Sequence, residues 1–117
     1  PESLKAIREV DSTKDMYVVI TMSHPKGGDY FDIENFCKLA LEVGATGVVA
    51  PATRPEDVAK VRNLVGDLEI ISPGVGAQGG SSKDTIEAGA NYIIVGRGIY
   101  LSDDPAAAAE KYSKELV

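Results

Sequence analysis

The amino-acid sequence predicts an α/β fold in which a parallel sheet of four strands is covered by helices. Four short apolar runs show no polar alternation, which is typical of strands buried on both faces. Segments with apolar residues at helical spacing separate these runs. The loops after the runs are rich in glycine, whereas the connections before them are short. This asymmetry indicates a barrel or open sheet with its ligand site at the carboxyl ends of the strands.

A helix precedes the first strand–helix unit. Residues 1–10 place apolar side chains on one helical face, and the first predicted strand follows at about 16–21. Residues 33–44 again show apolar positions at helical spacing, and Gly44 is a typical helix stop. A strand followed by a crossover helix is the repeating unit of a parallel sheet.

The second unit begins with a predicted strand at about 46–50. The residues from Thr53 to Glu56 have the pattern of a capping box, with Pro55 in the first turn. We therefore expect Thr53 to cap the helix that follows, which carries a stripe of valines on one face.

The third and fourth units follow the same order. The predicted strands are at about 68–72 and 92–95. Ser82 is the expected cap of a short helix between them, and Asp104 is the expected cap of the last helix. Four units are half the number in a closed (βα)8 barrel. We therefore expect residues 1–117 to form a single domain or a half-barrel segment.

The composition narrows the function classes. Hydrophobic residues make up 44% of the chain and charged residues 26%, as in ordinary soluble proteins. A net charge of −6 without a basic run argues against a nucleic-acid or acidic-membrane binder. The single cysteine, Cys37, fits a reducing compartment, and its helical apolar face predicts a buried, inert thiol. With no signal peptide or membrane-spanning run in the sequence, we expect a cytoplasmic protein.

The strongest functional signal is the glycine-rich loop after the third strand, residues 73–80, which holds four glycines and one polar side chain, Gln78. Glycine leaves backbone amides uncovered, and such amides suit phosphate. Gly96 and Arg97 follow the fourth strand in a similar way. We therefore predict one anion site shared by two neighbouring strand ends.

Four segments together resemble the orotidine 5′-monophosphate decarboxylase family, in its archaeal form: 21–25, 50–56, 71–80 and 94–100. The resemblance covers essentially the whole chain, in order and at the expected spacing. It implies the second half of a TIM barrel, strands five to eight of a phosphate-binding (βα)8 barrel. It also implies a carboxy-lyase of pyrimidine biosynthesis, which converts orotidine monophosphate to uridine monophosphate and CO2 without a metal or an organic cofactor.

The resemblance assigns roles to individual residues. Ser23 matches a serine that hydrogen-bonds the pyrimidine, and Pro73 matches the wall of the base pocket. Gln78 matches a glutamine that touches the phosphate and bridges the closed loop to the base. Gly96 and Arg97 match the pair that holds the phosphate. The implied substrate-binding set is Ser23, Pro73, Gly74, Val75, Gly76, Ala77, Gln78, Gly79, Gly80, Gly96 and Arg97.

The family's catalytic Asp-x-Lys-x-x-Asp pattern, with an earlier lysine, does not occur in this sequence. We therefore expect no catalytic residue in this chain. The implied partners are the nucleotide substrate, the N-terminal half of the same barrel and a further copy of the protein, with no nucleic acid and no membrane.

Other interpretations of these residues remain open. The Gly-x-Gly-x-x-Gly spacing that starts at Gly74 also matches a dinucleotide fingerprint, although Ile94 stands where an acidic residue is expected. The glycines could form a tight loop without a ligand, Arg97 a surface ion pair, and His24 a general base. The alternative functions are a phosphosugar aldolase or decarboxylase of the same barrel superfamily, and a non-catalytic half-barrel that binds a phosphorylated ligand.

Overall fold

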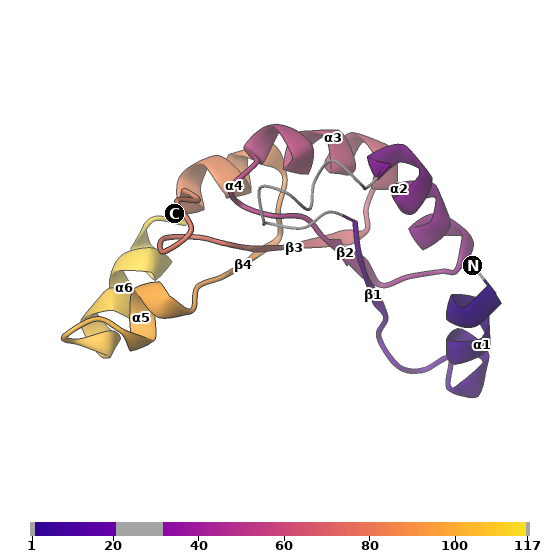
Figure 1. Ribbon diagram of the computed structural model, residues 1–117, viewed down its shortest axis with the longest axis horizontal. Coiled ribbons are helices and arrows are strands. Elements are labelled where there is room, and N and C mark those ends of the chain that lie inside the picture. The colour runs from indigo at the N-terminus through magenta and orange to yellow at the C-terminus, as the bar shows by residue number, and fades with distance from the viewer. Residues whose placement is uncertain (1, 21–31, 117) are drawn as a thin grey trace.

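The computed structural model describes residues 2–20 and 32–116. Its strands are β1 (Tyr17–Val19), β2 (Gly47–Val49), β3 (Glu69–Pro73) and β4 (Tyr92–Ile94). Its helices are α1 (Glu2–Val10), α2 (Ile33–Glu42), α3 (Pro55–Val65), α4 (Ser82–Ala88), α5 (Arg97–Tyr100) and α6 (Pro105–Lys114). The strands form one parallel sheet in the order β1-β2-β3-β4. Figure 1 shows an arch in which α2, α3 and α4 cover the outer face of the sheet.

The core lies between this outer face and the three covering helices. Val18, Val48 and Ile70 stand side by side in the register of the first three strands and are at most 8% exposed. Residues of α2 and α3 complete the core, among them Cys37, Ala40, Val58, Val61 and Val65. Burial of this apolar surface is the main favourable contribution to folding.

The inner face of the sheet has no such cover among the described residues. Val19 is 45% exposed, Tyr92 55% and Ile94 51%. The strands are apolar on both faces, as the sequence indicates, but helices cover only one of them. An apolar inner face is what the interior of a closed barrel requires, because its side chains pack against those of the opposite strands.

The predicted capping box of α3 is not formed. The N-cap residue is Arg54, one position later than predicted, and it makes no side-chain capping hydrogen bond. The hydroxyl of Thr53 is buried and has no hydrogen-bond partner in the part of the chain that the structure describes. Pro55 supplies the start of the helix, since proline fixes a helical φ and needs no acceptor at the first position.

The N-caps of α4 and α6 are formed by side-chain oxygens that accept hydrogen bonds from backbone amides. The cap of α4 is Ser81, whose side chain accepts a hydrogen bond from the Asp84 amide, whereas the predicted cap, Ser82, lies inside the helix and is buried. Two adjacent serines made this shift of one residue invisible in the sequence. The prediction for α6 is confirmed, because the Asp104 carboxylate accepts from the Ala107 amide at 3.1 Å.

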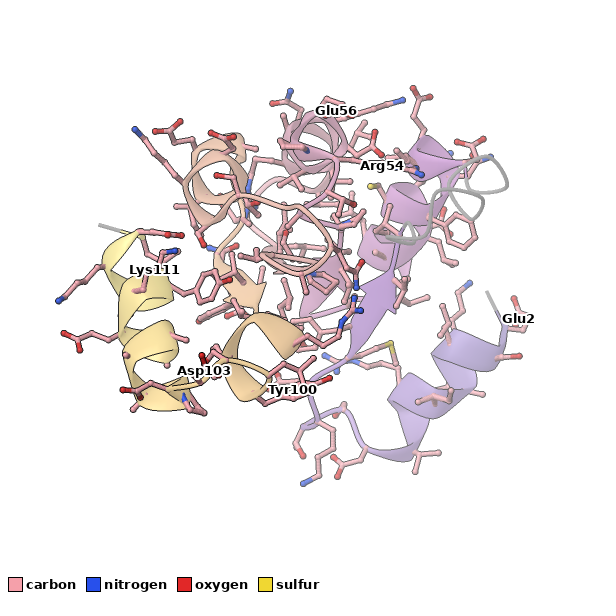
Figure 2. The ribbon with its side chains drawn as sticks, turned by 60° about the vertical axis from the view of Figure 1, so that its left-hand side comes forward. Glu2, Arg54, Glu56, Tyr100, Asp103 and Lys111 are labelled. Atoms are coloured by element: carbon pink, nitrogen blue, oxygen red, sulfur yellow. The ribbon has the colours of Figure 1, made fainter. Side chains whose placement is uncertain are left out.

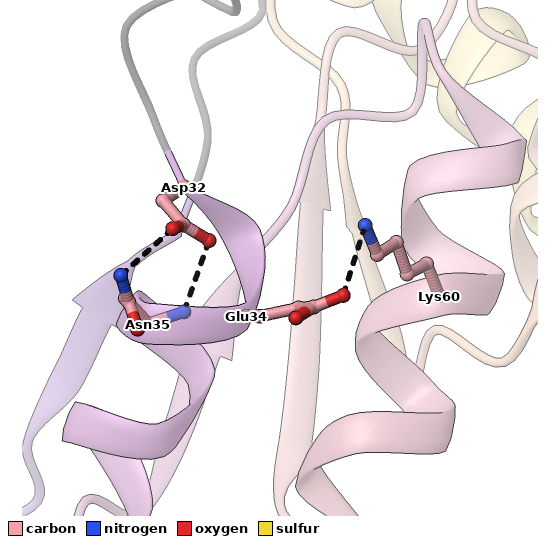
Figure 3. Close-up of polar contacts among 4 residues, drawn as sticks. All are labelled: Asp32, Glu34, Asn35 and Lys60. Carbon is pink, nitrogen blue, oxygen red and sulfur yellow. Dashed lines mark hydrogen bonds and ion pairs between the residues drawn. The ribbon is translucent and has the colours of Figure 1, made fainter.

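Polar contacts at the surface join α2 to α3 (Figure 3). The Asp32 carboxylate caps α2 by accepting from the Asn35 amide at 3.2 Å and from its side chain at 2.7 Å. Glu34 on α2 and Lys60 on α3 form an ion pair at 3.7 Å, with both side chains at least half exposed. Such an exposed pair contributes little to stability.

Arg62 on α3 makes a much denser set of contacts at the amino-terminal ends of β3 and β4. Its guanidinium donates to the carbonyls of Gly66, Leu68 and Gly89 and to the Asn91 side-chain oxygen, at 2.6–3.0 Å. The same Asn91 oxygen accepts from a backbone amide of β3 at 2.9 Å. A planar guanidinium can hold several acceptors in fixed geometry, so one side chain joins two helix ends to two strand starts.

A second polar contact crosses the inner face at the same end of the sheet. The Tyr17 hydroxyl donates to the Glu69 carboxylate, passing over Gly47 on the strand between them. A Cβ at Gly47 would lie 2.6 Å from the Tyr17 ring, so only glycine leaves room for this contact. The hydrogen bond to Glu69 is the main reason that the pKa of Tyr17 is raised to about 12.

Cys37 lies in the core at 1% exposure, as expected of a structural cysteine. Burial raises the pKa of its thiol to about 11, so the reactive thiolate is disfavoured at neutral pH.

No helix in the described ranges has the length and apolar character needed to cross a bilayer.

We expect Arg62→Ala to lower the free energy of unfolding by about 2–4 kcal/mol, because it leaves several partly buried acceptors without a donor. Lys60→Ala on the same helix is the matched control and should change it by no more than about 0.5 kcal/mol. Urea denaturation of the protein that carries this chain measures both. Equal effects of the two substitutions would contradict the importance of the Arg62 contacts.

The Tyr17–Glu69 contact should appear in an alkaline titration. Because the folded-state pKa of Tyr17 lies above the ordinary value of 10.0, its stabilising effect is complete below about pH 10 and is lost as the pH rises towards 12. One of the five tyrosines should therefore ionise later than an ordinary tyrosine in the folded protein. Ultraviolet absorbance of tyrosinate follows this step, and Tyr17→Phe should remove it. A late step that persists in Tyr17→Phe would assign it to another group.

Candidate functional site

The parallel pairing of β3 and β4 brings their carboxyl ends together, with Pro73 opposite Ile94. A cavity of about 210 Å³ lies between the loops that follow the two strands. Its lining residues are Pro73, Gly74, Val75, Ala77, Gln78, Ile94, Gly96, Arg97 and Tyr100. The structure thus brings together most of the predicted set, whereas Gly76, Gly79 and Gly80 lie in the same loop without lining the cavity. Ser23 and His24 lie outside the described residues.

The glycine-rich loop holds its shape by hydrogen bonds within itself. The amides of Gly76, Gly79 and Gly80 donate to loop carbonyls at 2.8–3.0 Å. These three amides are therefore not available to a ligand. The prediction that the amides of this loop bind an anion then applies to fewer of them than its glycine content suggests. The amides of Ala77 and Gln78 donate to no residue in the part of the chain that the structure describes, so they remain able to meet an anion at the cavity.

The glycines of the two loops serve different purposes. Gly74, Gly76 and Gly79 all have positive φ, between 79° and 98°, which other residues rarely adopt. A Cβ at Gly79 would meet nothing within 4 Å, whereas one at Gly76 or Gly98 would collide with the hydroxyl of Tyr112. Gly76 and Gly98 are thus explained by packing, and Gly79 leaves space open beside the loop.

Among the described residues that line the cavity, Arg97 is the single charged one. It begins α5 and is exposed, and its guanidinium makes no hydrogen bond or ion pair with any residue of the described ranges. Among these residues, no carboxylate pairs with Arg97 as the alternative of a surface ion pair would require. A guanidinium held at the cavity without a carboxylate partner can take up an anion.

Sequence reasoning missed α5. It also missed two residues that line the cavity, Ile94 at the end of β4 and Tyr100 on α5. The four-residue helix contains Gly98, which disfavours helix, so no periodic signal was available. Tyr100 stands three positions after Arg97, the spacing that places two side chains on one face of a helix. Figure 2 shows Tyr100 on α5, next to α6, which carries Lys111.

Among the described residues, the lining of the cavity contains no aspartate, glutamate, histidine or lysine. Within the described ranges, no group of His, Cys, Asp or Glu side chains is arranged to hold a metal ion. At the neighbouring end of β2, burial raises the pKa of Asp57, and Arg54 at 3.9 Å opposes that rise. The cavity is therefore equipped to bind an anion and not, by itself, to transfer a proton.

The fold and the cavity define a piece of a parallel α/β barrel with a cationic cavity at its strand ends. Residues 1–112 match the model of the orotidine 5′-phosphate decarboxylase / HUMPS family. An orotidine 5′-phosphate decarboxylase of Methanococcoides burtonii is 57% identical over 87% of this chain and 49% of its own length. That of Methanosarcina acetivorans is 52% identical over 98% of this chain and 54% of its own length. The chain belongs to this family.

Solved structures confirm the predicted fold class. An orotidine 5′-monophosphate decarboxylase from Methanocaldococcus jannaschii, complexed with the inhibitor BMP, superimposes with a TM-score of 0.89 at 35% identity. That match covers 97% of this chain and 56% of the other. The enzyme from Sulfolobus solfataricus gives a TM-score of 0.86 at 31% identity over 98% and 54% of the two chains. The four βα units are thus half of a TIM barrel, and the chain spans about half the length of its relatives.

Proposed function

We propose that this chain is the phosphate- and base-binding half of an orotidine 5′-phosphate decarboxylase, a carboxy-lyase that converts orotidine monophosphate to uridine monophosphate and CO2 in pyrimidine biosynthesis. The observation that carries the proposal is the cavity at the ends of β3 and β4, with Arg97 as its charged lining residue. Relatives of this name at 57% and 52% identity support it.

The cavity has the chemistry of a phosphate site. A phosphate needs a cation and several hydrogen-bond donors, and Arg97, Gln78 and the free amide of Ala77 supply both. Pro73 and Tyr100 add apolar surface at the same opening, where a nucleotide base would lie against them. In this proposal Gly96 gives the phosphate room to approach, since a Cβ there would touch only Tyr100, at 3.6 Å.

Residues of the other barrel half would carry out the decarboxylation step. Among the described residues, the cavity lining contains no aspartate, glutamate, histidine or lysine, and the family's catalytic Asp-x-Lys-x-x-Asp pattern does not occur in this sequence. Phosphate binding far from the reacting carbon would still favour catalysis, because binding energy from a remote group offsets the cost of strain and closure at the reacting bond. No metal or organic cofactor is part of the proposal.

The proposed partners follow from the open sheet. Among the described residues, the outer edges of β1 and β4 pair with no further strand, and the inner face between them is largely apolar. Both features drive association. We propose that the N-terminal half of the same barrel covers them, that residues 1–117 form one such segment, and that the completed barrel assembles into homo-oligomers. The proposed location is the cytoplasm, without nucleic-acid or membrane partners.

A decarboxylation assay tests the proposal. The completed barrel, made of this chain and the family's other half, should release CO2 from orotidine monophosphate and bind uridine monophosphate. Turnover of a phosphosugar in place of orotidine monophosphate would favour the sugar enzyme, whose metal ligands would then lie in the other half. Nucleotide binding without turnover would favour a non-catalytic module.

Arg97→Ala should weaken binding of uridine monophosphate by about 2–4 kcal/mol, because a charge-assisted contact with the phosphate is lost. Lys83→Ala, an exposed cation on α4, is the control for the change in net charge and should leave the affinity unchanged. Calorimetry of the completed barrel measures both. A change below about twofold for Arg97→Ala would remove this residue from the site.

Gln78→Ala should mainly raise KM, with a smaller fall in kcat. Its contact with the phosphate would exist in both the ground state and the transition state, and such uniform binding affects KM. Steady-state kinetics with orotidine monophosphate separates the two constants. A large fall in kcat at unchanged KM would instead show that Gln78 takes part in the chemical step.

A further inference from the structure

The Tyr112 hydroxyl touches the backbone of both loops that form the cavity. A Cβ built on Gly98, in the turn that carries Arg97, would lie 2.5 Å from this oxygen and 3.1 Å from the ring carbon that bears it. A Cβ built on Gly76, in the glycine-rich loop, would collide with the same oxygen and lie 3.1 Å from the same carbon. One side chain thus stands against two loops that follow different strands.

On α6, Ala108 and Tyr112 are half-buried and the other residues are exposed. The helix has no fully buried residue and packs mainly against α5, while Tyr112 itself is half-buried. Its hydroxyl makes no hydrogen bond with a residue in the described ranges. The hydroxyl therefore makes van der Waals contacts with the two loops. A side chain at Gly76 or Gly98 would prevent these contacts.

We propose that Tyr112 is a positioning residue for the anion site: as a rigid spacer, it sets the distance between the glycine-rich loop and the turn that carries Arg97. This inference rests on the proposed function, because it assigns the spacing to phosphate recognition. The ring has few rotatable bonds, and both contacts are at its tip, so movement of either loop towards the other is blocked by the same oxygen.

The spacing matters because the proposed phosphate ligands come from both sides. Gln78 and the free amide of Ala77 belong to one loop, and Arg97 belongs to the other. An anion bound by both sides loses affinity when they drift apart, since each contact depends on donor position within a fraction of an ångström. Tyr112 does not line the cavity, so its effect passes through the loops.

Gly98 offers a test that separates spacing from folding. Its φ lies outside the positive range that alanine disfavours, and alanine is a better helix former than glycine. Gly98→Ala alone should therefore lower the affinity for uridine monophosphate about fivefold, because the new methyl group meets the Tyr112 hydroxyl and displaces the turn. In the Tyr112→Ala background both the oxygen and the ring carbon 3.1 Å from the new methyl group are gone, and the same substitution should cost less than about twofold.

The single substitutions at Tyr112 complete the cycle. Tyr112→Ala should lower the affinity about tenfold and raise KM in step, with kcat within about twofold, because binding and not the chemical step is affected. Tyr112→Phe keeps the ring and should lose no more than about threefold. Ser113→Ala, an exposed neighbour on α6, is the control. Equal costs of Gly98→Ala in both backgrounds, or unchanged binding by Tyr112→Ala, would overturn the inference.

Failure of the proposed function gives a different result. A completed barrel with Tyr112 intact that neither binds uridine monophosphate nor releases CO2 contradicts that function. Hydrogen exchange then still tests the spacer, because amides of residues 74–80 should exchange faster in Tyr112→Ala than in Ser113→Ala whether or not a ligand binds. Equal exchange in the two variants would overturn the inference on its own.

Discussion

The hydrogen-bonded pairing of β3 with β4 is the constraint on which the rest of the site depends. Its register sets Ile71 opposite Tyr92 and Pro73 opposite Ile94, so both chains leave the sheet at the same level. This register makes the glycine-rich loop and the turn with Arg97 neighbours. In a parallel sheet all strands end on one side, which is why polar groups far apart in sequence meet there without any direct contact between their helices.

Much of this arrangement could be predicted from sequence because the signals were local or periodic. A few adjacent residues are enough to recognise each of the four apolar runs and the glycine at the end of α2. The loops of β3 and β4 were predicted as partners because parallel strands end together. What could not be predicted depends on residues distant in sequence. The contact of Tyr112 with Gly76 and Gly98 joins positions 36 and 14 apart, and neither spacing has a local signature.

The misplaced caps have the same origin. Thr53 and Ser82 carry suitable hydroxyls, but both hydroxyl oxygens are buried and have no hydrogen-bond partner among the described residues. Cap preferences describe helix ends exposed to water. Where the preferred hydroxyl is buried, a neighbouring residue takes the N-cap position, which is Arg54 for α3. For α4 the preceding serine, Ser81, fills the role.

The contacts of Arg62 bear on how such a barrel can acquire new ligands. They lie at the amino-terminal ends of β3 and β4, at the far end of the strands from the cavity. Residues that secure the strands and residues that meet a ligand are thus separated by the length of the sheet. Mutations in the cavity loops should leave the Arg62 contacts in place, since effects of distant sites on stability are nearly independent. A protein designer could rebuild the cavity and leave the opposite end untouched.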